Sequence, residues 1–368
     1  MGIKNLNKFL RNNCPDIFEE IHISEYSYKK VAIDISLYLC KFKTVCGDRW
    51  LSAFINLIAC LRKNEVHCVF CYDNGAPPEK ELERKKRATQ RTKMEERVYK
   101  LEEAIEKYNL TSEIDNILIE FYKKKKKVEG VQKRLLGRDV NIINMDFVIE
   151  AVKKMRSQIL DIKPEDFALT KRLFDVLNVP YYDAPLEAET MCSDLCKRGI
   201  VDAVLSEDTD VIAYGSPVFL SKINTANGTC VRIKYPELLK QLGLLDYEFL
   251  DLCIMCGTDY NKNIFRVGPE KAYTYIQKYS TIEGISTNTT LDVNILNHVR
   301  GRELFREYKQ KDINKIPYCG SPNFNDLSKF IFTHNIKLSI EGLKKSFTHS
   351  IIIFDECDKE GKEGKEDK

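Results

Sequence analysis

The sequence predicts an α/β fold with a mostly parallel central sheet. Three short apolar runs, at residues 30–34, 66–72 and 201–205, have the length and the β-branched composition of buried strands. Helical patterns separate these runs, and such alternation of strands and helices is typical of parallel sheets. At 368 residues with 43% hydrophobic content, the chain is large enough to bury this core without disulfides.

Each of the three predicted strands ends in an acidic residue. The run KVAID ends at Asp34, the run VHCVFCYD stops at Asp73, and VDAVLSEDTDV places Asp208 and Asp210 just beyond its apolar residues. A single aspartate after a strand is as well explained by a turn or a helix N-cap. Because ligands gather at the carboxyl ends of parallel strands, three such strands together indicate a site.

Three further acids follow the same logic. The segment YDAPLEAETMC predicts a helix that begins near Pro185, with Glu187 and Glu189 in its first turn, and Asp259 follows an apolar helix in CGTDY. The helix dipole explains one acid in a first turn better than it explains two. The candidate site therefore contains seven carboxylates: Asp34, Asp73, Glu187, Glu189, Asp208, Asp210 and Asp259.

Such a cluster predicts bound metal. Two ionised carboxylates at ~4 Å repel by about 4 kcal/mol at an effective dielectric near 20, so the cluster needs cations. Oxygen ligands without histidine or cysteine favour Mg²⁺, with Mn²⁺ as a substitute, over zinc. Two such ions per site, roughly 3.5 to 4 Å apart, hydrolyse phosphodiesters by activating water and stabilising the leaving oxygen.

Composition and motifs argue against several other classes. The 58 basic and 55 acidic residues nearly cancel, and neither a G-x-S-x-G elbow nor a Walker loop is present. No apolar stretch is expected to be long enough to cross a bilayer. The 13 cysteines lie mostly in apolar runs, which predicts a reducing, intracellular setting. The pairs Cys68/Cys71 and Cys253/Cys256 are better explained as small buried hydrophobes than as zinc ligands.

The middle of the chain has a different character. Residues 78–156 are rich in charge and poor in glycine and proline, which predicts a long, solvated helical insertion that interrupts one sheet. The lysine run Lys123–Lys127 is most simply solvated charge, with a nuclear address or a strand contact as alternatives. The tail from Asp355 has almost no apolar residue and is predicted to be disordered.

Two long blocks of the sequence resemble the flap endonuclease and XPG family of nucleases. The motifs that carry the resemblance are MGIKNL, KVAIDIS, VFCYDNGAPP, VPYYDAPLEAE, LSEDTDVIAYGS, DLCIMCGTDY and VGPEKAY. The resemblance implies a PIN-like α/β fold with a helical arch and a helix-two-turn-helix DNA-binding element. The implied regions are the N-terminal nuclease region 1–95, the charged helical arch 96–160, the internal nuclease region 161–280, the C-terminal helical region 281–354 and the disordered tail 355–368.

The same resemblance implies roles for individual residues. The seven acids match the family's metal ligands, and Lys80 and Arg87 resemble the basic pair that steers the scissile phosphate. The spacing after the Pro77-Pro78 turn is one residue short of the usual pattern. The implied DNA contacts are Gly2, Gly268 and Lys271.

A monovalent cation site, filled by K⁺, is implied near Asn263–Val267. The Arg-Gly pair that is usual in the family is replaced here by Phe265-Arg266, so the sequence does not decide whether the cation site is kept. Cys40 stands where family members that act on flaps usually stack a tyrosine, and Tyr38 is expected to face elsewhere on its helix. A sliding-clamp motif is absent near the C-terminus.

The expected function is that of a structure-specific DNA endonuclease, acting by two-metal catalysis at 5′ flaps or single-strand/duplex junctions in replication, repair or recombination. A 5′-to-3′ exonuclease or a junction resolvase on the same core is the first alternative, and a non-catalytic DNA-binding scaffold is the second. The expected partner is junction-containing DNA, without a membrane. A monomer in the nucleus, or in the host nucleus for a viral protein, is expected from this substrate.

Overall fold

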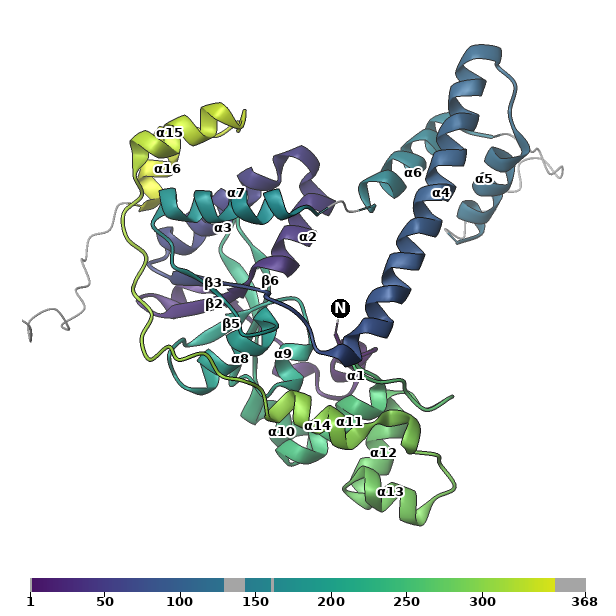
Figure 1. Ribbon diagram of the computed structural model, residues 1–368, viewed down its shortest axis with the longest axis vertical. Coiled ribbons are helices and arrows are strands. Elements are labelled where there is room, and N and C mark those ends of the chain that lie inside the picture. The colour runs from purple at the N-terminus through teal and green to yellow at the C-terminus, as the bar shows by residue number, and fades with distance from the viewer. Residues whose placement is uncertain (1, 129–142, 160–161, 348–368) are drawn as a thin grey trace, which may run out of the picture. The chain divides into compact units, whose positions relative to one another are not determined.

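The computed structural model describes residues 2–128, 143–159 and 162–347 (Figure 1). The chain divides into two compact units. The first consists of Met1–Phe42, Asp48–Glu81 and Lys163–Lys368, and the second of Lys43–Gly47 and Leu82–Ile162. The tail predicted to be disordered lies outside the described residues.

A seven-stranded sheet forms the centre of the first unit, with the strand order β1-β7-β6-β5-β2-β3-β4. Strands β2, β3, β4, β5 and β6 run parallel, whereas β7 pairs antiparallel with both β1 and β6. The predicted α/β class with a mostly parallel sheet is confirmed. The strands are β1 (Glu19–His22), β2 (Lys30–Asp34), β3 (His67–Tyr72), β4 (Tyr181–Asp183), β5 (Ala203–Leu205), β6 (Val218–Asn224) and β7 (Thr229–Lys234).

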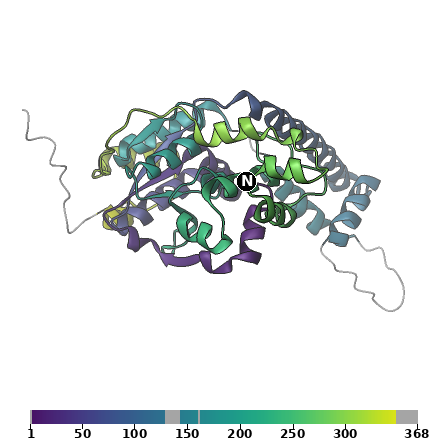
Figure 2. The same cartoon turned by 90° about the horizontal axis from the view of Figure 1, so that it is seen from below.

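Helices cover both faces of this sheet (Figures 1 and 2). Side chains alternate between the faces along β3, so Val69 and Cys71 join the core on the side of α8 (Ala188–Lys197). On the other face, Phe70 stacks on Phe174 of α7 (Pro164–Leu177), with ring centroids 4.1 Å apart. Phe54 of α3 (Trp50–Lys63) meets both rings edge-on. The sheet is therefore a rigid platform for the loops at its edge.

The remaining elements of the first unit are helical and include the region after residue 260. They are α1 (Leu6–Asn13), α2 (Ile35–Cys46), α9 (Asp210–Ala213), α10 (Tyr235–Leu242), α11 (Asp246–Cys256), α12 (Pro269–Tyr279), α13 (Ile282–Asn288), α14 (His298–Arg306), α15 (Phe324–Thr333) and α16 (Ile340–Phe347), with short 3-10 turns between some of them.

One segment of the described residues, Ile35–Lys63, is long and apolar enough to cross a membrane by length and composition. The expectation that no stretch approaches this length was wrong. The segment contains α2, a 3-10 turn and α3, and about half of its apolar window is buried in the protein. Core helices meet the same criterion, so this segment is weak evidence for a membrane.

The predicted insertion is helical. It contains α4 (Glu81–Thr111), α5 (Asn116–Val128) and α6 (Met145–Ser157), and their apolar side chains, Leu101 and Phe121 among them, form a small core of their own. Strands β3 and β4 pair directly although the insertion lies between them, so it interrupts one sheet as predicted. The role of residues 96–160 as an arch stays a prediction.

Candidate metal and catalytic site

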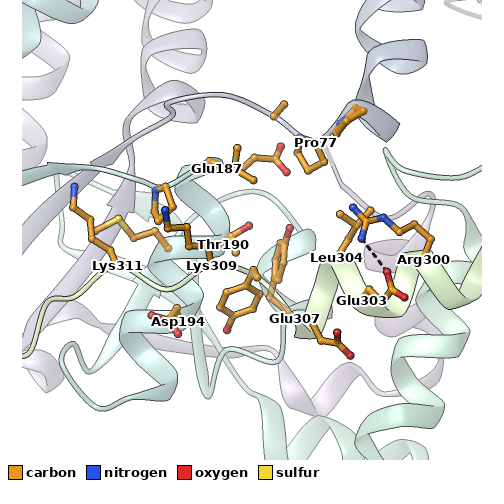
Figure 3. A pocket seen from close by; sticks show the side chains of 17 residues that line it. Pro77, Glu187, Thr190, Asp194, Arg300, Glu303, Leu304, Glu307, Lys309 and Lys311 are labelled. Carbon is orange, nitrogen blue, oxygen red and sulfur yellow. Dashed lines mark hydrogen bonds and ion pairs between the residues drawn. The ribbon is translucent and has the colours of Figure 1, made fainter.

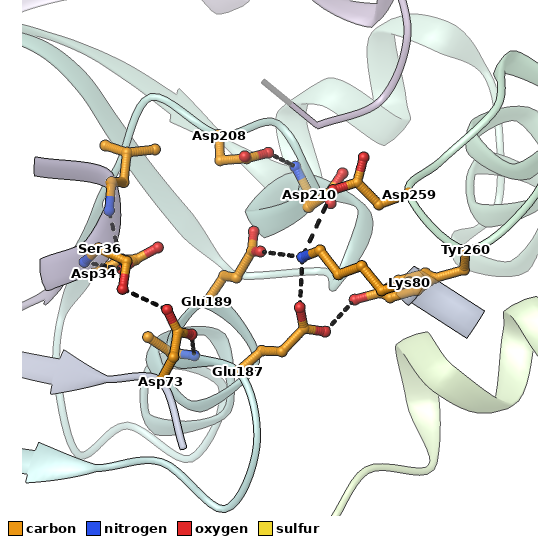
Figure 4. Close-up of polar contacts among 12 residues, drawn as sticks. Asp34, Ser36, Asp73, Lys80, Glu187, Glu189, Asp208, Asp210, Asp259 and Tyr260 are labelled. Carbon is orange, nitrogen blue, oxygen red and sulfur yellow. Dashed lines mark hydrogen bonds and ion pairs between the residues drawn. The ribbon is translucent and has the colours of Figure 1, made fainter. Parts of the chain in front are cut away.

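The carboxyl ends of β2, β3 and β5 lie side by side, and an acid lies at or shortly after the end of each strand (Figure 4). Asp34 is the last residue of β2, and its Oδ1 accepts a hydrogen bond from the backbone of Ser36 at 2.8 Å. The Ser36 hydroxyl in turn donates to Oδ2 of Asp73, which follows β3. The Oδ1 atom of Asp73 accepts from the backbone of Ala188 at 2.7 Å. One hydrogen-bonded chain therefore connects two strand ends to the start of α8.

The acids of the LEAE segment enter the site at the start of α8. This helix begins at Ala188 and not near Pro185, because Glu187 is its extended N-cap residue, with φ −95° and ψ 138°. An extended residue before a helix lets positions i and i+2 point toward the same space. Both glutamates are buried, and both contact the ammonium of Lys80.

Three acids form the tightest part of the cluster. One ligand oxygen from each of Glu189, Asp208 and Asp210 lies within 4.8 Å of the others. Among the described residues, Oε2 of Glu189 and Oδ1 of Asp210 are buried without a hydrogen-bond partner. Buried polar atoms are rarely left unpaired in this way. Anionic oxygens that lack a donor suit a hard divalent cation, so this donor set fits Mg²⁺ or Mn²⁺.

The electrostatics of the cluster agree with this assignment. Burial raises the pKa values of Asp34, Glu189 and Asp210 well above their ordinary range, and neighbouring carboxylates raise them further. Burial also raises the pKa of Asp208, although a hydrogen bond from the backbone of Asp210 opposes the change. A divalent cation would remove this resistance to ionisation because it supplies the missing opposite charge.

Lys80 is the positive charge within the cluster. It ends the 3-10 turn η4 (Pro78–Lys80), and its Nζ lies 2.5 Å from Glu187 Oε1, 3.3 Å from Glu189 Oε1 and 3.6 Å from Asp259 Oδ2. Burial alone would lower the pKa of Lys80, but the carboxylates of Glu189 and Glu187 outweigh it, so the pKa is raised. The ammonium therefore stays charged.

Arg87, the predicted partner of Lys80, lies on α4 in the second unit and pairs with Glu83, with 3.4 Å between Nε and Oε1. Its role beside Lys80 stays a prediction.

The seventh acid, Asp259, follows α11 and reaches the cluster together with its neighbour. The hydroxyl of Tyr260 donates to Glu187 Oε2 at 2.6 Å and lies 2.7 Å from the hydroxyl of Tyr214. Sequence reasoning missed both tyrosines and also Ser36. The adjacency of Tyr260 to Asp259 and of Ser36 to Asp34 was the available signal, whereas nothing in the sequence connects Tyr214 to the site.

Gly2 lies against the loop that carries two of the acids. Its φ is +82°, and a Cβ atom there would lie 2.1 Å from Asp208 Oδ1 and 2.8 Å from the backbone nitrogen of Asp210. The backbone of Lys4 donates to the carbonyl of Gly257 at 3.1 Å and fixes this segment in place. Only glycine fits so close an approach. The predicted contact between Gly2 and DNA stays a prediction.

The other predicted DNA contacts lie at the start of α12. Gly268 is its N-cap residue, and a Cβ atom there would meet nothing within 4 Å. Lys271 is exposed in the first helical turn. Backbone amides at such a helix start can bind phosphate.

Residues 38 and 40 lie on α2. The side chain of Tyr38 is completely buried and packs on Phe42, with ring centroids 5.5 Å apart. Tyr38 therefore faces elsewhere, as predicted, and does not replace a stacking tyrosine. Cys40 is partly exposed.

A cavity of about 210 Å³ is lined by Glu187 among other residues (Figure 3). Its walls combine apolar side chains such as Leu304 and Tyr308 with charged ones such as Lys309. Arg300 also lines it and is held by Glu303, with 2.9 Å between Nη1 and Oε2. Glu187 therefore belongs both to the acidic cluster and to the wall of a mixed apolar and charged pocket.

Comparisons with known proteins show which sequences the chain resembles. Residues 1–94 match the XPG N-terminal domain, and residues 178–259 match the XPG I-region. The probable RAD2-like endonuclease 369L of Invertebrate iridescent virus 6 is 32% identical, and the alignment covers 100% of this chain and 96% of that protein. The flap endonuclease 1 of Babesia bovis is 29% identical over 91% of this chain and 45% of that protein.

Solved structures share the fold. The catalytic core of Rad2 in complex with DNA substrate superposes with a TM-score of 0.63 at 14% identity, covering 94% of this chain and 99% of that one. The flap endonuclease-1 from Methanococcus jannaschii gives a TM-score of 0.58 at 22% identity, covering 90% of this chain and 95% of that one.

Proposed function

Because the chain belongs to the flap endonuclease and XPG family of RAD2-like nucleases, we propose that it is a magnesium-dependent endonuclease that cuts DNA at single-strand/duplex junctions. The observation that carries this proposal is the buried cluster of Glu189, Asp208 and Asp210, whose unpartnered oxygens suit a divalent cation. A DNA-binding scaffold would gain nothing from acids that repel phosphate. The runner-up is a 5′-to-3′ exonuclease or junction resolvase with the same site.

We assign the metal to the acids as follows. Glu189, Asp208 and Asp210 would hold one ion, and the remaining acids at the same sheet edge, Asp34 and Asp73 among them, would help to hold a second. Bound Mg²⁺ would activate water and stabilise the leaving oxygen of the phosphodiester. The hydrogen bonds from Ser36 to Asp34 and Asp73 would orient these two carboxylates.

Lys80 would bind the scissile phosphate. Its ammonium lies among Glu187, Glu189 and Asp259, three of the acids that would hold the metal. The same ammonium would donate to a phosphate oxygen at this end of the sheet. Tyr260 would keep Glu187 in position, because its hydroxyl donates to the carboxylate.

Duplex binding is assigned to the segment between α11 and α12 and to the start of α12. Gly268 and Lys271 would contact the phosphate backbone without reading bases, and K⁺ near residues 263–267 would complete this contact. Gly2 would contact DNA beside the acids. A monomer that acts on replication, repair or recombination intermediates in the nucleus is the corresponding biological setting.

The test is cleavage of a 5′-labelled flap oligonucleotide with Mg²⁺ and with EDTA. We expect a metal-dependent cut at the flap base, at least 1000-fold slower (on the order of ~4 kcal/mol) in a variant carrying Asp208→Ala and Asp210→Ala. The matched control is Asp16→Ala, since Asp16 is exposed in a short turn of the same unit. Unchanged cleavage by the double variant would refute the catalytic assignment.

Single-stranded, nicked and four-way substrates distinguish the runner-up. Stepwise trimming from a 5′ end would move the assignment to an exonuclease, and paired symmetric cuts in the four-way junction would move it to a resolvase. In both cases the metal site would be retained, because arch and duplex contacts select the substrate whereas the metals cut it.

A further inference from the structure

The turn between α11 and α12 has an exposed aromatic tip. Phe265 is 82% exposed, whereas its neighbour Ile264 is 8% exposed and Val267 is 5% exposed. The backbone of Val267 donates to the carbonyl of Ile264 at 3.1 Å, and the side chain of Asn263 donates to the carbonyl of Val267 at 3.4 Å. Two buried anchors and two hydrogen bonds therefore hold the turn and present Phe265 to the outside.

Arg266, beside Phe265, adopts an unusual backbone conformation. Its φ is +60°, in the left-handed region where a residue with a Cβ atom is strained. Its guanidinium carbon lies 5.0 Å from the centroid of the Phe265 ring, so the two side chains project together. Strain of this kind concentrates at functional sites. The Arg266 side chain is exposed, so it is available to a ligand beside Phe265.

The charge around the tip selects an anionic ligand. The segment 261–271 contains Lys262, Arg266 and Lys271, and all three side chains are exposed. Its one acid, Glu270, accepts a hydrogen bond from Asn13 on α1 at 3.1 Å. A basic surface with a protruding aromatic ring matches the surfaces of proteins that contact the DNA backbone and insert an apolar side chain into the minor groove.

The tip also lies within reach of the proposed cut. Phe265 follows Asp259 by six residues, so at most roughly 20 Å of chain separates the tip from the acidic cluster. Base pairs rise by ~3.4 Å along a duplex. A duplex whose scissile phosphate lies at the acids would therefore present its groove to the tip within about six base pairs of the cut.

We propose that Phe265 inserts into the minor groove of the duplex part of the substrate and that Arg266 binds a flanking phosphate. This contact would set the distance between the duplex and the metal site. The inference rests on the proposed function. It assigns a side-chain contact to the tip in addition to the main-chain contacts at the start of α12.

The experiment measures binding of the full-length protein to a labelled blunt duplex and to a single strand in EDTA, by fluorescence anisotropy at several salt concentrations. We expect Phe265→Ala to weaken duplex binding about fivefold or more, as loss of an aromatic contact to DNA does. Phe265→Trp should retain the affinity. The matched control is Phe332→Ala on α15, because Phe332 is 88% exposed and belongs to another element. It should stay within about twofold of the wild type.

The Arg266→Gly variant gives a second test, because its thermal stability and its DNA affinity are expected to change differently. Glycine relieves the left-handed strain, so the melting temperature should stay equal or rise. Loss of one phosphate contact should lower the slope of log affinity against log salt by about 0.9. A merely structural role for Arg266 would instead leave this slope unchanged, and that result would overturn the phosphate contact.

Three outcomes overturn the contact made by Phe265. They are equal duplex affinities of the Phe265→Ala and Phe332→Ala variants, a loss confined to the single strand, and an equal loss on both DNAs. The proposed function is judged separately, by wild-type cleavage of the flap with Mg²⁺. A wild type that cuts while Phe265→Ala binds normally would refute this inference alone, and a wild type that binds duplex but never cuts would refute the catalytic function.

Discussion

Replacing Asp210 with asparagine is expected to stabilise the metal-free protein and to abolish cleavage. Asp210 is 1% exposed, and its Oδ1 has no hydrogen-bond partner among the described residues. Asparagine has nearly the same shape, removes one negative charge, and supplies an amide group that can donate to a neighbouring carboxylate. The same change removes a proposed metal ligand.

The distances set the size of the effect. Ligand oxygens of Glu189, Asp208 and Asp210 lie within 4.8 Å of one another, and at an effective dielectric near 20 two unit charges at that separation repel by about 3.5 kcal/mol. Lys80 offsets part of this repulsion because it lowers the pKa of Asp210. We therefore expect a net gain of about 2 kcal/mol, which raises the melting temperature by roughly 4 to 8 °C in a unit of this size.

The pH dependence follows from the direction of the pKa shift. Burial, with Asp208 and Asp259, raises the pKa of Asp210 in the folded protein. The folded state then binds its proton more tightly than the unfolded state, so the stability of the metal-free protein falls as pH rises above about 4. The advantage of Asp210→Asn should be small near pH 4 and should grow toward pH 8.

The assay is thermal or urea unfolding in EDTA at pH 4 to 8, followed by Mg²⁺ titration. Mg²⁺ should stabilise the wild type and should stabilise Asp210→Asn much less, since binding to the folded state alone raises stability. Asp16→Asn, an exposed change in the same unit, is the control. A variant that is less stable than the wild type at pH 8, or a gap that does not change with pH, would refute the reasoning.

The remaining predictions concern three other side chains. Lys80→Met should lower the cleavage rate at least 100-fold (about 3 kcal/mol). It should lower duplex affinity less than about threefold (~0.7 kcal/mol). Equal losses in the rate and affinity assays would contradict the role of Lys80 at the phosphate. Gly2→Ala should reduce Mg²⁺-dependent cleavage at least tenfold (about 1.4 kcal/mol), because its Cβ would displace the carboxylate of Asp208; full activity would show that this segment moves aside. A hydrogen bond from Arg302 lowers the pKa of Glu283 to about 2. Glu283 therefore stabilises the protein above pH ~4.5 and loses this effect as pH falls through about 2, so Glu283→Gln should cost less than about 1 kcal/mol at pH 7 in urea unfolding and less still at pH 2.

Much of the site could be predicted because its parts follow strand ends. Asp34 is the last residue of a short, apolar, parallel strand and Asp73 directly follows another, and the geometry of a parallel sheet brings such positions together. The start of α8 was less predictable, since Pro185 is a favourable first helical residue. The hydrogen bond from Ala188 to Asp73 fixes the helix start three residues later, and that tertiary contact is invisible in the local sequence.

Other features depend on contacts between distant segments. Tyr214 approaches Tyr260 because α9 and α11 pack together, and Tyr214 lies in no sequence pattern that indicates a polar role. The antiparallel strands β6 and β7 follow the last acidic strand, and their pairing with β1 joins residues near the N-terminus to residues near 230. The sequence analysis also failed to identify α2 and α3 as one apolar segment long enough to cross a membrane. Length and composition do not distinguish a core segment from a membrane span, because burial in a core and burial in a membrane require similar composition.

The separation of the acids along the chain bears on how the protein is made. The pairing of β3 with β4 must wait until the whole insertion has been synthesised, and the cluster must wait for Asp259. At about 5 to 20 residues per second, a ribosome needs on the order of 10 to 45 s to pass from residue 34 to residue 259. Throughout that interval the emerging chain lacks the complete acidic cluster. The proposed site therefore cannot form before residue 259 of 368 has been synthesised.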